Sequence, residues 1–121
     1  MTSKKILIVD DDYCVAMPLE FLLKHNGYQV KTARNGEDAL QMVSGFMPDI
    51  VLLDVLLPLL DGFEICQIIR ENTRYRDMKI IFLTALIRDV DIAKGLALGA
   101  DAYITKPFAN AKLMETLKKL L

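Results

Sequence analysis

Short strand-like runs alternate with helical patterns along the whole chain, and this alternation limits the possible folds more than any other feature. Five runs have the length and residue types of strands: 5–9, 28–33, 49–53, 79–83 and 102–105. Each is followed by a stretch with apolar residues at helical spacing, namely 15–25, 37–44, 63–70, 89–98 and 110–121. The sequence therefore predicts five consecutive strand–helix units.

The expected sheet is parallel, because most of the strand runs are nearly continuously apolar, as in sheets covered by helices on both faces. With right-handed crossovers, the expected fold is α/β, a doubly wound three-layer (βα)5 sandwich. Among the common strand orders we favour 2-1-3-4-5, and in such a sheet ligands bind beyond the carboxyl ends of the strands. Gly95 is expected to break the fourth helix, and Pro18 to weaken one backbone bond of the first.

Length and composition indicate one domain covering residues 1–121, because 121 residues suit a single core and 53% of them are hydrophobic. The formal net charge is -1, so bulk electrostatics give no reason to expect direct nucleic-acid binding. No apolar run approaches the roughly 20 residues of a membrane span, and the first residues lack a signal-peptide cleavage site. Two isolated cysteines, Cys14 and Cys66, suggest reduced structural thiols and a cytoplasmic location.

Polar side chains stand at the carboxyl ends of four of the predicted strands. Asp10 and Asp11 follow the first strand. Asp54 follows the third strand, Thr84 ends the fourth and Lys106 follows the fifth. In a parallel sheet these ends share one edge, which then holds three carboxylates, a hydroxyl and an amine. Clustered carboxylates repel one another, and a hard divalent cation such as Mg²⁺ relieves that repulsion.

A cation beside Asp54 would also neutralise an incoming phosphoryl group, so that this carboxylate can attack phosphorus. Lys106 supplies a second positive charge and Thr84 a hydroxyl donor, and phosphoryl transfer needs little beyond positioning and charge stabilisation. Taken singly, Thr84 is a turn residue and Lys106 a solvated lysine, and for Asp12 we favour a helix N-cap. The sequence does not determine the isomer of the Lys106–Pro107 bond.

Four motifs follow one another along the chain: KILIVDDD at 5–12, DVLLPLLDG at 54–62, TA at 84–85 and ADAYITKPF at 100–108. Together they resemble the motifs of response-regulator receiver domains, the CheY-like family, in their order and with compatible spacing. The resemblance covers essentially the whole chain. It implies a flavodoxin-like, CheY-like fold and a role in two-component signal transduction, and not a turnover enzyme.

The resemblance assigns the acidic residues. Asp54 matches the phosphoacceptor, which takes its phosphoryl group from a sensor histidine kinase or a histidine phosphotransfer protein. Asp10 and Asp11 match the pair that holds Mg²⁺ together with Asp54, with Asp11 a direct ligand and Asp10 acting largely through water. Leu56 matches the position whose backbone carbonyl binds the metal.

The resemblance also implies a switch. Thr84 matches the switch hydroxyl, Lys106 the lysine that contacts the phosphate, and Tyr103 the aromatic switch residue. Ala85, next to the phosphate, is small and leaves the site open to a donor. Once Thr84 moves toward the phosphate, Tyr103 can rotate inward; the alternative for Tyr103 is a half-buried strand aromatic.

The surface expected to change comprises 89–98, 102–105 and 110–121, and a homodimer through it is conceivable in this family. Lys112 and Thr116 stand where winged-helix regulators tend to have an acid and an arginine for dimer salt bridges, so that particular dimer is less expected here. Either a downstream target or an output domain missing from this chain would read the switch. The sequence identifies neither the kinase nor the target.

Several leucines depart from the family pattern. Leu56 and Leu86 occupy positions that flank the entry route of the hydrolytic water, and our hypothesis is a slow loss of the phosphoryl group. Leu59 and Leu60 stand where polar or small residues are commoner. We expect one or both to fold onto the core, and the alternative is an apolar contact with a partner. Cys14 lies close to the predicted site, although we favour structural packing for it.

Three other functions compete with a switching receiver. A receiver that only binds proteins is disfavoured by the complete set of polar residues at the strand ends. A haloacid-dehalogenase-type phosphatase needs an acid two residues after the nucleophile, where this chain has Leu56. A flavodoxin-like cofactor binder needs a phosphate-binding loop after the first strand, where the three consecutive aspartates would repel phosphate.

Overall fold

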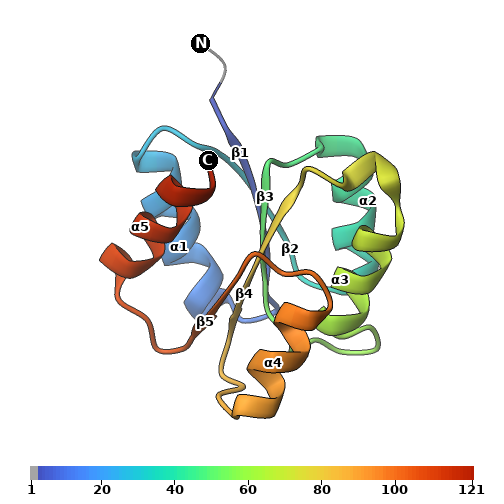
Figure 1. Cartoon of the computed structure of the whole chain (residues 1–121). Helices are drawn as coiled ribbons and strands as arrows, with labels where there is room; N and C mark the ends of the chain where they lie inside the picture. Colours follow the sequence, from blue (N-terminus) through green and yellow to red (C-terminus); the bar gives the residue numbers. More distant parts are fainter. Residues whose placement is uncertain (1–2) are drawn as a thin grey trace.

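The computed structural model describes residues 3–121, and within them five parallel strands form one sheet in the order β2-β1-β3-β4-β5, as predicted (Figure 1). The strands are β1 (Lys5–Val9), β2 (Gln29–Ala33), β3 (Ile50–Leu53), β4 (Lys79–Thr84) and β5 (Ala102–Thr105). The helices are α1 (Tyr13–His25), α2 (Gly36–Phe46), α3 (Gly62–Glu71), α4 (Asp89–Ala97) and α5 (Asn110–Leu120), with a short 3₁₀ helix at Thr73–Tyr75.

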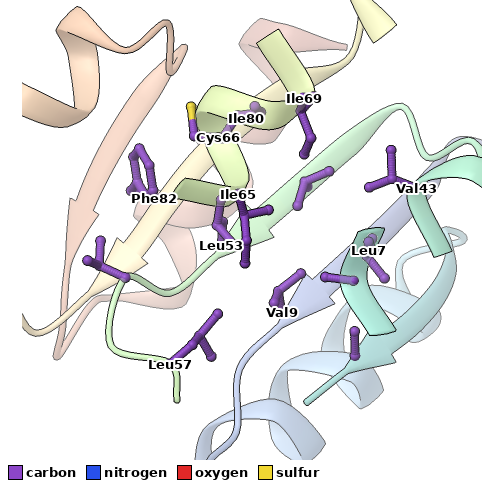
Figure 2. Packing of buried hydrophobic residues seen from close by; sticks show 14 of the residues in the cluster. Leu7, Val9, Val43, Leu53, Leu57, Ile65, Cys66, Ile69, Ile80 and Phe82 are labelled. Atoms are coloured by element: carbon purple, nitrogen blue, oxygen red, sulfur yellow. The ribbon is translucent and has the colours of Figure 1, made fainter. Parts of the chain in front are cut away.

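Side chains of β1 alternate between two hydrophobic cores, one on each face of the sheet. Ile6 and Ile8 pack in the core formed with α1 and α5. Leu7 and Val9 pack in the core formed with α2 and α3, whose interlocking side chains are shown in Figure 2. Figure 1 shows α1 and α5 together on one side of the sheet and α2 and α3 on the other. Because both faces are buried, residues 6–9 of the strand are all apolar.

Side-chain N-caps begin α1, α2 and α3, whereas α4 and α5 start without one. Asp12 caps α1, as predicted, and its side chain accepts a hydrogen bond from the Cys14 amide at 2.9 Å. Asp61 caps α3 in a reciprocal pair with Glu64, whose side chain accepts from the Asp61 amide. The spacing of these two acids matches a capping box, a signal that we did not use in the sequence analysis. These two caps fix the loops that follow β1 and β3.

The prediction that Gly95 breaks the fourth helix is wrong, because α4 runs without interruption from Asp89 to Ala97. Gly95 is buried, and a Cβ atom there would lie 3.0 Å from the rings of both Phe82 and Tyr103. Glycine is therefore needed for close packing of α4 against the sheet, and the helical backbone tolerates it. No helix within residues 3–121 combines the length and the apolar character that a membrane crossing requires.

Candidate functional site

The parallel register brings the three aspartates together at one edge of the sheet. β1 and β3 are neighbours, with Val9 opposite Leu53, so the residues that follow them leave the sheet side by side. The Asp54 amide donates to the Val9 carbonyl at 3.0 Å, and the Asp10 amide donates to the Ala33 carbonyl at 3.1 Å. As a result, carboxylate oxygens of Asp10, Asp11 and Asp54 lie within 4.8 Å of one another.

Lys106 enters this acidic cluster from the end of β5. Its Nζ lies 2.7 Å from Oδ2 of Asp10 and 3.2 Å from Oδ2 of Asp54, so one ammonium group bridges two carboxylates. The Lys106 amide donates to the Thr84 carbonyl at 2.9 Å, which continues the pairing between β4 and β5. The Lys106–Pro107 peptide bond, undecided from sequence, is cis.

Burial affects the pKa values of Asp10 and Lys106 in this acidic cluster. Asp10 and Asp54 are only 4% and 6% exposed. Burial raises the pKa of Asp10 above its ordinary 3.8, and hydrogen bonds from Lys106 and the Asp12 amide offset this only in part. Burial alone would lower the pKa of Lys106, but its hydrogen bond to Asp10 and the charge of Asp54 outweigh that effect and raise it. The ammonium therefore stays charged while Asp10 is an unfavourable site for a negative charge.

Replacing Asp10 with asparagine is expected to raise the free energy of unfolding at about pH 7 when divalent cations are absent. The folded-state pKa of Asp10 lies above its unfolded value, so the charged carboxylate opposes folding above that pKa. As the pH falls through the raised pKa of Asp10, this carboxyl becomes protonated in the native protein and the advantage of asparagine should shrink. Denaturant unfolding in the presence of a chelator measures this, with exposed Asp77→Asn as the control. An advantage that grows toward acid pH would contradict the electrostatic account.

The donor set fits a hard divalent cation. Three carboxylates from two adjacent strand ends supply oxygen atoms, which Mg²⁺ prefers, and Asp11 is exposed on the solvent side where retained waters have room. The predicted fourth ligand, the carbonyl of Leu56, belongs to a residue whose amide donates to Oδ1 of Asp54 at 3.2 Å. Leu56 thus follows Asp54 in a tight turn beside the cluster, and its side chain is 53% exposed.

The predicted switch residues form a connected chain next to the acidic cluster. Thr84 is fully buried, and its Oγ1 accepts from the Leu86 amide at 3.4 Å. The hydroxyl of Tyr103 donates to the Leu86 carbonyl at 2.8 Å, and its ring lies 5.7 Å from that of Phe82. Tyr103 is thus packed against the core in this structure, and Leu86 links it to Thr84. Ala85 is exposed, as expected for a small residue at an open site.

Of the leucines that differ from the family pattern, some pack against the core and others are exposed. Leu60 and Leu86 pack partly against the core on the α2 and α3 side. Leu59 is fully exposed and has a left-handed backbone with φ of 67°, which is rare for a residue with a branched side chain. The expectation that one or both loop leucines fold onto the core is therefore correct for Leu60 alone.

The two cysteines have different surroundings. Cys66 is fully buried, as predicted, and burial raises the pKa of its thiol to about 11. Cys14 is exposed and lines a pocket of about 490 Å³ together with Ala85, Lys106 and Phe108. The expectation of structural packing for Cys14 is therefore wrong, because the first turn of α1 directs it toward solvent beside the site.

Arg34 lies near the site, and the sequence did not predict this. The Arg34 guanidinium lies 3.7 Å from the centroid of the Tyr13 ring, and its Nη2 donates to the Asp11 carbonyl at 3.2 Å. A single arginine after a strand carries no local signal, because its partners are 21 and more residues away in the sequence. Only the pairing of β1 with β2 brings them together.

Comparison with known proteins identifies the family. The profile of the response regulator receiver domain matches residues 6–118, so the chain belongs to this family of two-component signalling modules. A putative response regulator from Chloroflexus aurantiacus is similar, at 37% identity and a TM-score of 0.93 over 98% of both chains. The Vibrio cholerae chemotaxis protein CheY4 shares 31% identity over 99% of this chain and 100% of its own, with a TM-score of 0.92.

A further similar structure comes from a larger signalling protein. The receiver domain of a signal transduction histidine kinase from Syntrophus aciditrophicus is 36% identical, with a TM-score of 0.90, over 98% of this chain and 90% of that one. Receiver domains as a family bind Mg²⁺ at an acidic pocket and interact with histidine kinases or phosphotransfer proteins. In this chain, Asp10, Asp11 and Asp54 form an acidic cluster whose carboxylate oxygens are close enough to share a metal ion.

Proposed function

We propose that residues 1–121 form one receiver domain in which Asp54 accepts a phosphoryl group from a partner phosphohistidine with the help of Mg²⁺. The observation that carries the proposal is the position of the Asp54 carboxylate. It is buried at the carboxyl edge of the sheet, 3.2 Å from the Lys106 ammonium and within 4.8 Å of two further carboxylates. No other carboxylate pair in residues 3–121 shares a lysine in this way.

The residues around Asp54 have distinct roles in this proposal. Asp10, Asp11, Asp54 and the Leu56 carbonyl would hold Mg²⁺, which would neutralise the charge of the phosphoryl oxygens. One oxygen of Asp54 attacks phosphorus, the bond from phosphorus to the donor nitrogen breaks, and the donor imidazole keeps that electron pair. Lys106 then turns from its carboxylate partners toward the new phosphoryl oxygens. Ala85 leaves room for the incoming donor because it presents only a methyl group.

The added phosphoryl group is also the trigger of the switch. It brings acceptor oxygens next to the buried hydroxyl of Thr84, which can donate to one of them. Thr84 already accepts from the Leu86 amide, and the Leu86 carbonyl holds the Tyr103 hydroxyl. A movement of Thr84 therefore passes along the loop after β4 to Tyr103 and to the surface of α4, β5 and α5.

That surface is where we place the output of the domain. A downstream target, an output domain or a second copy of the chain would distinguish its two states, whereas direct nucleic-acid binding is not expected at a net charge of -1. The related DrrB receiver domain, 36% identical with a TM-score of 0.88, has been solved in a BeF3-activated form. In this proposal the chain catalyses only its own phosphorylation and dephosphorylation, and its cytoplasmic location stays a prediction.

Incubation with acetyl phosphate and Mg²⁺ tests the proposal. The intact mass of the wild-type protein is expected to increase by one phosphoryl group, and the Asp54→Asn variant is expected to show no increase. Omitting Mg²⁺ or adding a chelator should prevent the increase in the wild type. Equal labelling of the wild type and Asp54→Asn would overturn the assignment of Asp54.

The exposed Leu56 is expected to protect the phosphoryl group from water. Its position flanks the entry route of the hydrolytic water, so a polar replacement gives that water a hydrogen-bonding partner. Leu56→Gln should shorten the phosphoryl lifetime roughly threefold to tenfold, on the order of 1 kcal/mol in the barrier. Leu86 is a poorer site for this test, because its side chain packs on the core.

The decay of the phosphorylated mass after removal of the donor measures this effect. Leu59→Gln is the matched control, since it changes another exposed leucine of the same loop. A lifetime that is unchanged in Leu56→Gln, or equally shortened in Leu59→Gln, would contradict the water-exclusion hypothesis.

A further inference from the structure

Arg34 connects the end of β2 with the start of α1, across the loop of three aspartates at 10–12. It directly follows β2, and the ring on which it lies belongs to Tyr13, the first residue of α1. A guanidinium that stacks through its flat face keeps its N–H groups free to donate in the plane of the group. Here Nη2 uses that freedom to donate to the carbonyl of Asp11 at 3.2 Å. One exposed side chain thus contacts the residues on both sides of Asp12.

The contact with Arg34 is important because Asp10 is fixed by several hydrogen bonds, whereas Asp11 is not. The Asp10 amide donates to the Ala33 carbonyl, its Oδ1 accepts from the Asp12 amide at 2.9 Å, and its Oδ2 pairs with Lys106. Asp11 is exposed, and the hydrogen bond from Arg34 is made to its backbone carbonyl. The direction of the Asp11 carboxylate therefore depends on how firmly the backbone is held at this one residue.

We propose that Arg34, stacked on Tyr13, is a positioning residue that presets Asp11 for the divalent cation. This inference rests on the proposed function, since it assigns a ligand role to Asp11. A ligand that is already fixed in its binding conformation loses less freedom when the cation binds, so the cation binds more tightly. Groups that orient a ligand from outside the coordination shell typically contribute 10-fold to 100-fold to metal affinity, and we expect about threefold to tenfold for this exposed contact.

Charge and positioning predict opposite effects for this residue. The Arg34 guanidinium is a cation close to the metal ligands, so its charge repels Mg²⁺. Removing the charge alone would tighten Mg²⁺ binding. Removing the positioning contact would weaken it. The sign of the change in Mg²⁺ affinity therefore separates the two effects.

Calorimetric titration with Mg²⁺ at low ionic strength tests the inference. Arg34→Met is expected to raise the Mg²⁺ dissociation constant about threefold to tenfold, and Arg34→Lys, which keeps the charge but not the planar group, should also raise it. Tyr13→Leu should act in the same direction, whereas Tyr13→Phe keeps the ring and should match the wild type. Arg74→Met, which removes an arginine over the ring of Tyr75, is the matched control and should leave the affinity unchanged.

Two further readouts separate positioning from a general loss of stability. Hydrogen exchange of the backbone amides at 11–14 should be faster in metal-free Arg34→Met than in the wild type. The Mg²⁺ concentration for half-maximal phosphorylation by acetyl phosphate should rise, and the rate at saturating Mg²⁺ should stay the same. If Arg34→Met does not fold, Arg34→Lys and Tyr13→Leu carry the same test.

The results distinguish a failure of this inference from a failure of the proposed function. Unchanged or tighter Mg²⁺ binding in both Arg34→Met and Tyr13→Leu would overturn the positioning role and leave the function intact. A wild-type protein that does not bind Mg²⁺ would overturn the proposed function, and with it the role of Arg34.

Discussion

Replacing Lys106 with methionine is expected to slow phosphoryl incorporation from acetyl phosphate by roughly 100-fold, about 2.7 kcal/mol in the barrier. The reason is that, among residues 3–121, Lys106 alone bridges Asp10 and Asp54, at 2.7 and 3.2 Å. Without it, an incoming phosphoryl group would meet the negative charges of Asp10 and Asp54 with no Lys106 charge to offset them. Methionine has a similar length and an apolar side chain, so the change removes the charge and leaves the packing nearly intact.

The same substitution should have the opposite effect on the metal. The ammonium of Lys106 repels Mg²⁺ and occupies carboxylate oxygens, so its removal should tighten Mg²⁺ binding. In the absence of metal, two buried carboxylates lose their counter-charge, and the free energy of unfolding at neutral pH should fall by roughly 1–3 kcal/mol. Lys118→Met removes the same charge from an exposed position on α5 and serves as the control. Weaker Mg²⁺ binding, or a phosphorylation rate like that of the wild type, would contradict the role given to Lys106.

Replacing Gly62 with alanine is expected to lower the free energy of unfolding by roughly 2–4 kcal/mol. A Cβ atom at this position would lie 2.2 Å from the carbonyl oxygen of Asp54 and 2.8 Å from Cα of Val55. Both atoms belong to the backbone, so no side-chain rotation can relieve the overlap. The first residue of α3 therefore packs directly on the backbone of Asp54 and Val55, and alanine must push α3 or Asp54 out of place.

Denaturant unfolding measures this effect, and a second glycine provides the comparison. Gly45 lies in α2, and a Cβ atom there has nothing within 4 Å. Gly45→Ala should therefore stabilise the protein by about 0.5–1 kcal/mol, because alanine is the better helix former. A Gly62→Ala protein as stable as the wild type would show that α3 does not approach Asp54 as closely as described.

The sequence alone was sufficient to predict the sheet and the set of polar side chains at its carboxyl edge. The runs at 6–9 and Ile50–Leu53 are apolar throughout because both faces of the sheet are covered, and this pattern needs no tertiary information. In a parallel sheet, the residues that directly follow the strands all lie at the same edge of the sheet. The proximity of Asp10, Asp54 and Lys106 therefore follows from strand order alone.

Features that depend on packing between distant segments were not predictable in this way. The role of Gly95 is set by the rings of Phe82 and Tyr103, which approach it from β4 and β5. The contact of Arg34 with Asp11 and Tyr13 exists only because β1 and β2 pair. The exposure of Leu59 and its left-handed backbone conformation could likewise not be predicted, since leucine disfavours both exposure and a positive φ.

Mapping the phosphoryl group to its residue tests the central claim most directly. After treatment with acetyl phosphate and Mg²⁺, borohydride reduction converts an aspartyl phosphate into homoserine, and peptide mass spectrometry locates the converted residue. We predict conversion at position 54 in the sample with Mg²⁺ and none in the sample with chelator. Conversion at another acidic residue, or at position 54 to the same extent without a divalent cation, would contradict the mechanism proposed for this site.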